Sequence, residues 1–343
     1  MSVATALSRD AAAALRTTAT AVRDATAADA VDGIAPGLVA SPTNTDQVAE
    51  VLRICAHHRL AVVARGGGTK ISWGSPPLRL DLLLDVSGLD RVVEHAAGDL
   101  IAVAGAGVRI AELNRVLGLA GQQLAVDETV AGATVGGTIC AGASGPQRLL
   151  RGTVRDLLIG LTFVRSDGKV VHAGGRVVKN VAGYDVCKLL VGSAGTLGVV
   201  TEAVFRLHPL PAARRVVTMA CDRPEDAGAL VARIVHGQTV PSAVEIDCPD
   251  DGQLVVAALL EGSPDPATSS ARSPTRCPSG GAATRGRRPT LLSSSPSASA
   301  GSPASSRAAP PPGRMARRRC RCVDRPAPAS STPRHTRRIP PSI

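Results

Sequence analysis

Three consecutive glycines between two positive charges are the clearest sign of chemistry in this chain. They lie in the stretch Arg65-Gly66-Gly67-Gly68-Thr69-Lys70, directly after the short apolar run 61–64. Glycines lack a Cβ atom, so successive N–H groups can turn toward one anion and positive φ angles are tolerated. The pattern predicts a buried strand that leads into a loop able to bind a pyrophosphate. Taken alone, the segment is also compatible with an ordinary glycine turn.

Two further segments of small residues strengthen the binding interpretation. Residues 134–145 and 192–198 consist largely of Gly, Ala and small hydroxyl residues. Small side chains at nearly every position indicate that a flat or bulky group approaches the backbone. Arg148, Arg151 and Arg155 follow the second segment and supply positive charge for a phosphate, with solvent-exposed arginines as the alternative. Three such segments favour a cofactor site over three unrelated turns.

Other reactive residue types form no catalytic or metal-binding pattern. Tyr184, the single tyrosine, is expected to be structural, and His236 has no histidine partner between residues 213 and 265. The first 265 residues contain five scattered cysteines: Cys55, Cys140, Cys187, Cys221 and Cys248. Their spacing fits no iron–sulfur or zinc site, and such scatter is typical of reduced thiols in a cytoplasmic protein. We therefore name no catalytic side chain and expect no metal.

Helical and strand patterns surround the glycine segments. Apolar residues from Val48 to Cys55 recur with helical spacing, which predicts an amphipathic helix over 43–59, with Thr43, Asn44 or Thr45 as its cap. Residues 1–30 form at most a loose helix, and a short helix is expected over 110–117. Strands are expected at 61–64, 80–84, 91–94, 100–104, 123–126, 157–164, 170–172 and 198–207.

The composition changes abruptly after residue 265. Residues 266–343 carry 15 Arg and one acid, Asp324, for a net charge of +14; since the whole chain has +11, the first 265 residues carry −3. This tail has too few apolar residues to form a core, so we expect it to be disordered. It lacks lysine and is rich in residue types with GC-rich codons, which favours an out-of-frame translation. A basic arm that binds anionic partners is the alternative.

The N-terminus and the hydropathy indicate a cytoplasmic protein. Arg9, Asp10 and Arg16 interrupt the N-terminal alanines, so the apolar core of a signal peptide is missing. No apolar run approaches the ~20 residues of a membrane-spanning helix. We therefore expect no membrane span.

The order of the three small-residue segments resembles the FAD-binding domain of the flavoproteins first described in p-cresol methylhydroxylase and vanillyl-alcohol oxidase. The matching segments are 65–69, 133–138 with 143–145, and 192–199. The resemblance covers about residues 35–212. Within the family, Val178-Lys179-Asn180-Val181-Ala182-Gly183-Tyr184-Asp185 most resembles the FAD-binding subunits of bacterial glycolate oxidases.

This resemblance implies a fold and a cofactor site. The fold is an α+β, two-subdomain FAD-binding domain, with pyrophosphate against the amides of residues 66–70 and 134–138 and with strand 199–201 near the adenine or the ring system. Covalent members of the family commonly carry His near the first loop, where this chain has Thr69 and Lys70, so we expect non-covalent FAD. The expected cofactor-binding residues are Arg65, Gly66, Gly67, Gly68, Thr69, Lys70, Thr134, Val135, Gly136, Gly137, Thr138, Ala143, Ser144, Gly145, Arg151, Gly198, Val199 and Val200.

The resemblance also implies a domain order. We expect an N-terminal extension (1–34), the FAD-binding domain (35–212), a truncated cap (213–265) and the tail (266–343). The cap should contain a strand at 216–219, a helix near 225–235, and strands near 243–246 and 253–259. Family members that oxidise 2-hydroxy acids alone carry a larger second domain with histidines and an acid. The short cap here argues against independent activity.

The expected function is that of an FAD-binding subunit of a glycolate (2-hydroxy acid) oxidase or dehydrogenase. Its partners would be a larger catalytic flavoprotein subunit and an iron–sulfur subunit, which could hold it at the inner membrane. A stand-alone FAD-linked oxidase of a sugar lactone or alcohol is one alternative. The other is a nucleic-acid or acidic-surface binder that uses the tail. No aromatic residues accompany the tail arginines, so no nucleic-acid partner is expected.

Overall fold

The computed structural model describes residues 8–176, 184–248 and 253–262. The segment 178–183, which carries most of the glycolate-oxidase resemblance, lies outside the described residues. The tail 266–343 also lies outside them, so both expectations about it stay untested.

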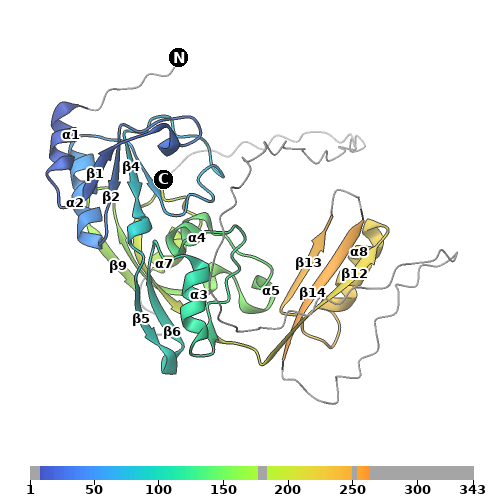
Figure 1. The fold of residues 1–343 in the computed structure, drawn as a ribbon. Helices are drawn as coiled ribbons and strands as arrows, with labels where there is room; N and C mark the ends of the chain where they lie inside the picture. The colour runs from blue at the N-terminus through green and yellow to red at the C-terminus, as the bar shows by residue number, and fades with distance from the viewer. Residues whose placement is uncertain (1–7, 177–183, 249–252, 263–343) are drawn as a thin grey trace, which may run out of the picture. The chain divides into compact units, whose positions relative to one another are not determined.

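The first sheet has four strands in the order β1-β2-β4-β3 (Figure 1). Its strands are β1 (Ala21–Asp24), β2 (Leu38–Ser41), β3 (Val62–Arg65) and β4 (Leu82–Asp85). Strand β4 is parallel to β2 and β3, whereas β1 is antiparallel to β2. The expectation that residues 1–30 form at most a loose helix is wrong, because β1 belongs to this sheet and helix α1 (Arg9–Arg16) buries Leu15 in the core.

Strand β3, expected to be buried, is a half-buried edge strand. Val62 and Ala64 pack on the main core, while Val63 packs on a small cluster on the other side of the sheet. An apolar strand at a sheet edge has the same sequence pattern as a central one, so the pattern could not tell them apart.

The second sheet has five antiparallel strands in the order β5-β6-β10-β8-β9. The strands are β5 (Val92–Ala96), β6 (Ile101–Gly105), β8 (Leu158–Val164), β9 (Val170–Gly174) and β10 (Val199–Arg206). The strands expected at 91–94 and 100–104 are confirmed and pair as the hairpin β5–β6, and those expected at 157–164 and 170–172 pair as the hairpin β8–β9. A two-stranded sheet joins β7 (Gln122–Gln123) to β11 (His208–Pro209), so the strand expected over 123–126 is much shorter.

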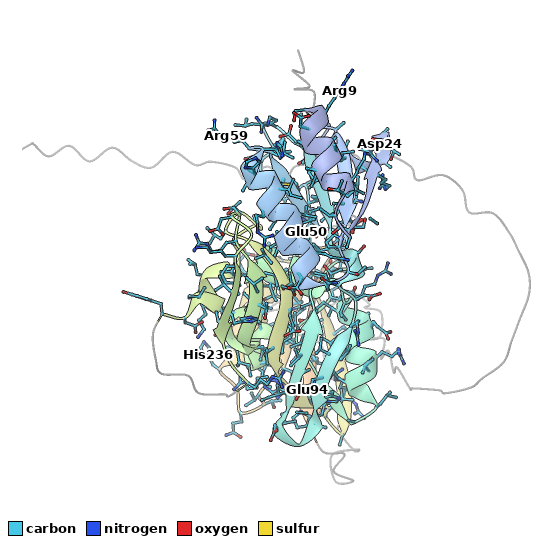
Figure 2. All side chains as sticks on the ribbon, turned by 90° about the vertical axis from the view of Figure 1, so that its left-hand side faces the viewer. Arg9, Asp24, Glu50, Arg59, Glu94 and His236 are labelled. Carbon is cyan, nitrogen blue, oxygen red and sulfur yellow. The ribbon has the colours of Figure 1, made fainter. Side chains whose placement is uncertain are left out.

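Helix α2 (Thr45–His57) joins the two sheets. The side chain of Asn44 accepts a hydrogen bond from the Gln47 N–H (2.9 Å), which confirms one of the expected caps. The apolar stripe that begins at Val48 is buried in one large core that includes residues of both sheets, and α2 packs on β8, β9 and β10. The exposed charged residues Arg9, Asp24 and Arg59 lie around α1, β1 and the C-terminal end of α2 (Figure 2).

The other helices of the first 212 residues are short. They are α3 (Ile110–Gly118), α4 (Val135–Ala141), α5 (Arg148–Arg151), α6 (Val154–Leu157) and α7 (Val186–Leu190), with 3₁₀ turns at η1 (Ala27–Asp29), η2 (Val86–Gly88) and η3 (Ala97–Asp99). Helix α3 confirms the expectation at 110–117. Helix α4 was not expected, because glycine-rich sequence has low helix propensity.

A third sheet follows, with its own small core. Its strands β12 (Ala213–Cys221), β13 (Ala243–Asp247) and β14 (Leu254–Gly262) lie in the order β12-β14-β13, and helix α8 (Pro224–Val235) packs on β12 and β14. The cluster at the centre of this core consists of the buried residues Cys221, Ala227, Leu230 and Val256. These are the elements expected for the partial cap. Across the described ranges, no helix is long and apolar enough to cross a membrane.

Candidate functional site

The first two glycine segments pack directly against each other. A Cβ atom built on Gly67 would collide with the carbonyl oxygen of Gly132, and one built on Gly66 would collide with the Thr134 hydroxyl. Of the three glycines in the first loop, Gly68 alone has a positive φ (+69°). Gly66 and Gly67 are therefore required by close approach between two segments, and Gly68 by backbone conformation.

The first loop presents a row of unpaired backbone donors. Within the described ranges, the N–H groups of Gly67, Gly68, Thr69 and Lys70 donate to no backbone or side-chain acceptor. The loop carbonyls are partly used, since Gly68 accepts from the Ile71 N–H (3.4 Å) and Lys70 accepts from the Trp73 N–H (3.1 Å). Successive N–H groups without acceptors form the kind of concavity that binds an anion.

Lys70 places a cation at the end of this row. Its ammonium lies 3.4 Å from the Thr69 hydroxyl and 5.6 Å from the centre of the Trp73 ring. Burial lowers the pKa of Lys70, while the negative charge of Glu128 acts in the opposite direction. Among the described residues the ammonium forms no ion pair, so its charge is available for a phosphate ligand.

Glu128 ties the second segment to this site. Its carboxylate accepts hydrogen bonds from the N–H groups of Gly132 (2.7 Å) and Ala133 (3.2 Å). These bonds fix the turn whose carbonyl faces Gly67. Glu128 therefore contacts both segments: it holds the backbone of the second segment by hydrogen bonds, and its negative charge interacts with Lys70 of the first loop.

Arg65, expected from the sequence to flank the loop with positive charge and to bind the cofactor, is paired with two carboxylates. Its guanidinium pairs with Asp85 (3.0 Å) and with the buried carboxylate of Asp29 (3.3 Å). Asp29 also accepts from both terminal nitrogens of Arg23 and from the N–H and hydroxyl of Thr26. The bond from Arg23 is the main cause of the lowered pKa of Asp29. Arg65 is a structural tie beneath the loop.

Most amides of the second segment already have acceptors within the protein. Thr134 caps helix α4, accepting from the Gly137 N–H through its hydroxyl (3.3 Å) and from the Thr138 N–H through its carbonyl (2.8 Å). The N–H groups of Val135 and Gly136 donate to the carbonyls of Val108 and Ala106, both at 2.8 Å. The amides of residues 135–138 are therefore already satisfied. Segment 132–138 forms the surface on which the first loop packs, here called the wall.

Residues 143–145 are held by an acid that the sequence did not single out. Asp127 accepts hydrogen bonds from the backbone N–H (2.8 Å) and the side-chain amide (2.6 Å) of Gln147. A Cβ atom on Gly145 would collide with the Asp127 side chain, while Ser144 accepts from the Val154 N–H (3.2 Å). Close packing of this turn accounts for its small residues.

Arg151 is engaged away from the glycine loops. Its guanidinium pairs at 2.8 Å with Glu261 of β14, a carboxylate that also binds Arg214 and the Ser242 hydroxyl at 2.8 Å each. The three donors lower the pKa of Glu261, although burial by itself raises it. The expectation that Arg151 faces a phosphate is not supported by this pairing.

The third small-residue segment lies at the other end of α4. Gly192 donates to the Ile139 carbonyl (3.0 Å) and Ala194 to the Cys140 carbonyl (2.8 Å), so both cover the helix C-terminus. Gly198, Val199 and Val200 are buried at the start of β10. There β10 pairs with β8 from Val199 onward but with β6 only from Glu202 onward. The backbone groups of Val199 and Val200 that face the β6 side of the sheet therefore do not pair with β6.

The acids of this region were missed in the sequence because they follow no motif spacing. Asp127 and Glu128 lie shortly before segment 132–138, and this position is the one sequence feature that could have pointed to them. For Asp29 no local pattern exists, since its partner Arg65 is 36 residues away. Among the described residues, no group of His, Cys, Asp and Glu could hold a metal ion. Burial raises the pKa of Cys140 to about 11 and that of Cys55 to about 12, so neither is a reactive thiol.

Comparison with known proteins points to an FAD-binding domain in the first part of the chain. Residues 36–174 match the family described as FAD binding domain. The chain is 33% identical over 211 residues to "Glycolate oxidase subunit GlcD" of Bacillus subtilis (strain 168), a match over 61% of this chain and 45% of that protein. It is 33% identical over 208 residues to "D-lactate dehydrogenase" of Archaeoglobus fulgidus, covering 61% of this chain and 46% of that protein. The chain spans about half the length of these relatives.

Solved structures share the fold at low sequence identity. Alkyldihydroxyacetonephosphate synthase matches with a TM-score of 0.60 at 20% identity, over 67% of this chain and 48% of that one. The Physcomitrella patens protein BBE-like 1 matches with a TM-score of 0.61 at 20% identity, over 76% of this chain and 58% of that one. The chain has the mixed α+β fold of FAD-binding domains of the p-cresol methylhydroxylase type, and the matched domain implies FAD as its cofactor.

Proposed function

We propose that this chain is the FAD-binding subunit of a 2-hydroxy acid oxidase or dehydrogenase of the glycolate type. It holds FAD without a covalent bond and works with a larger catalytic flavoprotein and an iron–sulfur protein. Bound FAD supplies the two-electron redox chemistry, and the protein supplies binding and orientation.

The observation that carries the proposal is the row of N–H groups at Gly67, Gly68, Thr69 and Lys70, which have no acceptor among the described residues. Main-chain donors suit a pyrophosphate because they need no matched cation for each oxygen. The Lys70 ammonium adds one charge at the end of the row. A Cβ atom at Gly67 would disrupt the wall that holds these donors in place.

Other residues act on the cofactor indirectly. Arg65 and Asp29 anchor the base of the loop, and Glu128 fixes the turn opposite it. The backbone at Val199 and Val200, outside the ladder with β6, is proposed to face the adenine or the ring system. Thr69 and Lys70 offer no imidazole for a covalent bond to the flavin, which supports non-covalent binding.

The proposal of partner subunits starts from the described part of the cap. His236 is exposed at the end of α8 and no metal cluster lies in the described ranges, so these residues supply no histidine cluster or metal for a 2-hydroxy acid. Similarity to a protein named as a glycolate oxidase subunit supports a complex. Equal identity to a D-lactate dehydrogenase makes D-lactate the second candidate substrate.

The test is to purify the chain with FAD, alone and with the proteins encoded beside its gene. We expect acid precipitation to release FAD into the supernatant, and dye reduction with glycolate or D-lactate only when the partners are present. Turnover by the chain alone would support a stand-alone oxidase. Flavin recovered only as a peptide adduct would contradict non-covalent binding.

A further inference from the structure

The third sheet contains the first part of a known supersecondary motif. In chain order its elements are β12, α8, β13 and β14, and β14 lies between the other two strands and antiparallel to both. This is the beginning of a split β-α-β unit, whose complete form is β-α-β-β-α-β. The elements not found among the described residues are a second helix and a fourth strand.

Handedness fixes where these two elements would lie. A crossover between parallel strands is right-handed, which applies to the connection from β12 through α8 to β13. The second crossover would start from β14, which runs antiparallel to β12. A right-handed connection over the same face of the sheet therefore leads from β14 toward β12, away from β13. The fourth strand would therefore pair with β12, which in the described ranges pairs with β14 alone. The second helix would lie beside α8.

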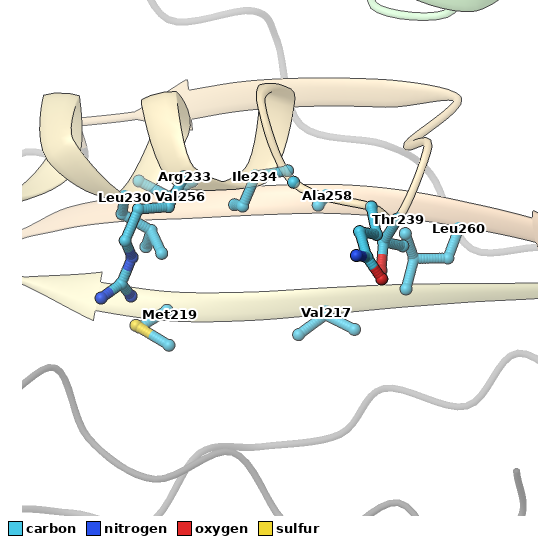
Figure 3. A pocket seen from close by; sticks show the side chains of 11 residues that line it. Val217, Met219, Leu230, Arg233, Ile234, Thr239, Val256, Ala258 and Leu260 are labelled. Carbon is cyan, nitrogen blue, oxygen red and sulfur yellow. The ribbon is translucent and has the colours of Figure 1, made fainter.

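An apolar groove lies where that helix is expected. It has a volume of about 320 Å³ and is lined by side chains from β12, β14 and α8 (Figure 3), including Val217, Met219, Ile234, Val256, Ala258 and Leu260. Strand alternation explains this composition, since 217 and 219 of β12 and 256, 258 and 260 of β14 share one face. Arg214 and Glu261, which pair with each other, belong to the opposite face.

We propose that the groove is the seat of an amphipathic helix, and the edge of β12 the partner of a strand that follows it. Both are supplied by the polypeptide encoded directly after Pro264 in a second reading frame. The sequence of the tail 266–343 offers too few aliphatic residues for the apolar face of such a helix: Leu291, Leu292, Val323, Ile339 and Ile343.

Two observations favour this occupant over a second copy of the chain. The curated relatives are about twice as long as the part of them that this chain matches, so more than half of each relative's sequence lies outside the match. The open edge of β12 and the groove also call for a strand and a helix at once, in the order in which a split β-α-β unit supplies them. Arg233 lines the groove and favours an acid on the docking helix.

The test uses the full chain and a synthetic peptide of roughly 40 residues, enough for one helix and one strand. Its sequence is translated from the second frame of the gene immediately after Pro264. We expect saturable binding and slower hydrogen exchange at the β12 amides, with no change in α2. Ala258→Asp, in the groove, should weaken binding roughly tenfold or more. The matched Ala220→Asp, on the opposite face of β12, should leave the affinity of the peptide unchanged.

Three results would overturn the proposal. The first is that neither alternative frame encodes a helix followed by a strand. The second is that the peptide does not protect β12, a measurement on the unmodified chain that holds even if Ala258→Asp fails to fold. The third is a dimer in sedimentation that dissociates in Ala258→Leu, which would assign the groove to a second copy. All three readouts are independent of FAD.

Discussion

Gly67 and the carbonyl oxygen of Gly132 approach so closely that no Cβ atom fits between them. The contact joins the end of one sheet strand to a turn 65 residues later in the chain. Since the unpaired N–H groups at 67–70 depend on it, the geometry of the proposed site rests on two backbone segments more than on side chains.

Gly67→Val should abolish FAD binding and also lower stability. The branched side chain must displace the Gly132 turn, and such overpacking typically costs about 1–3 kcal/mol. The measurements are the flavin-to-protein ratio after reconstitution and the midpoint of thermal unfolding. Gly98→Val is the matched control, because a Cβ atom there meets nothing within 4 Å. Full flavin occupancy in Gly67→Val would reduce the loop to a structural turn.

Lys70→Gln should weaken FAD binding roughly tenfold or more, the usual value of a hydrogen bond to a charged group. The single tryptophan, Trp73, reports the binding, since Lys70 lies over its ring and bound flavin would quench its fluorescence. The weakening should shrink at high salt as the charge is screened. Lys169→Gln, in the exposed turn between β8 and β9, is the control. If the two variants bind FAD with equal affinity, Lys70 does not contribute to the FAD site.

Asp29→Asn should lower the thermal midpoint by several degrees and loosen the base of the loop. The change takes the charge from a buried carboxylate held by Arg23 and Arg65. The lowered pKa of Asp29 means that its contribution is present at neutral pH and is lost as the pH falls below the ordinary carboxyl value of about 4. The difference between wild type and variant should therefore narrow from pH 5 to pH 3 or so.

The control for this prediction is the exposed Asp99, where Asp99→Asn should leave the midpoint unchanged at each pH. A wild-type-to-variant difference that stays constant through the acid range would contradict the ionic role of Asp29. In that case its hydrogen bonds to Thr26 would be the main contribution.

Much of the fold could be predicted because its signals are local. The helical spacing that begins at Val48 and the cap at Asn44 together located α2, and the strand patterns at 157–164 and 170–172 located β8 and β9. Strand β1 escaped because its partner β2 lies beyond the turn at Asp32 and Gly33, and because exposed polar residues interrupt its pattern. Helix α4 escaped because tertiary contacts, rather than propensity, hold its glycines in a helix.

The site was predictable in outline and less so in detail. The glycine loop stands out in sequence because no other residue type allows the close approach at Gly67. The partners of Arg65 and Arg151, Asp29 and Glu261, lie 36 and 110 residues from them. An arginine beside a glycine segment has the same sequence pattern whether it meets a phosphate or a carboxylate. The ion pairs of both arginines could therefore not be predicted from the local sequence.

The most direct test of the central claim is a titration of ¹⁵N-labelled protein with FAD, followed through the amide signals of Gly67, Gly68, Thr69 and Lys70. These N–H groups have no protein acceptor in the described ranges, so a bound pyrophosphate should shift all four together and saturate at one FAD per chain. The amides of Val135 and Gly136, already bonded to Val108 and Ala106, should move far less. FAD binding that leaves the four loop signals in place, or no FAD binding at all, would contradict the account.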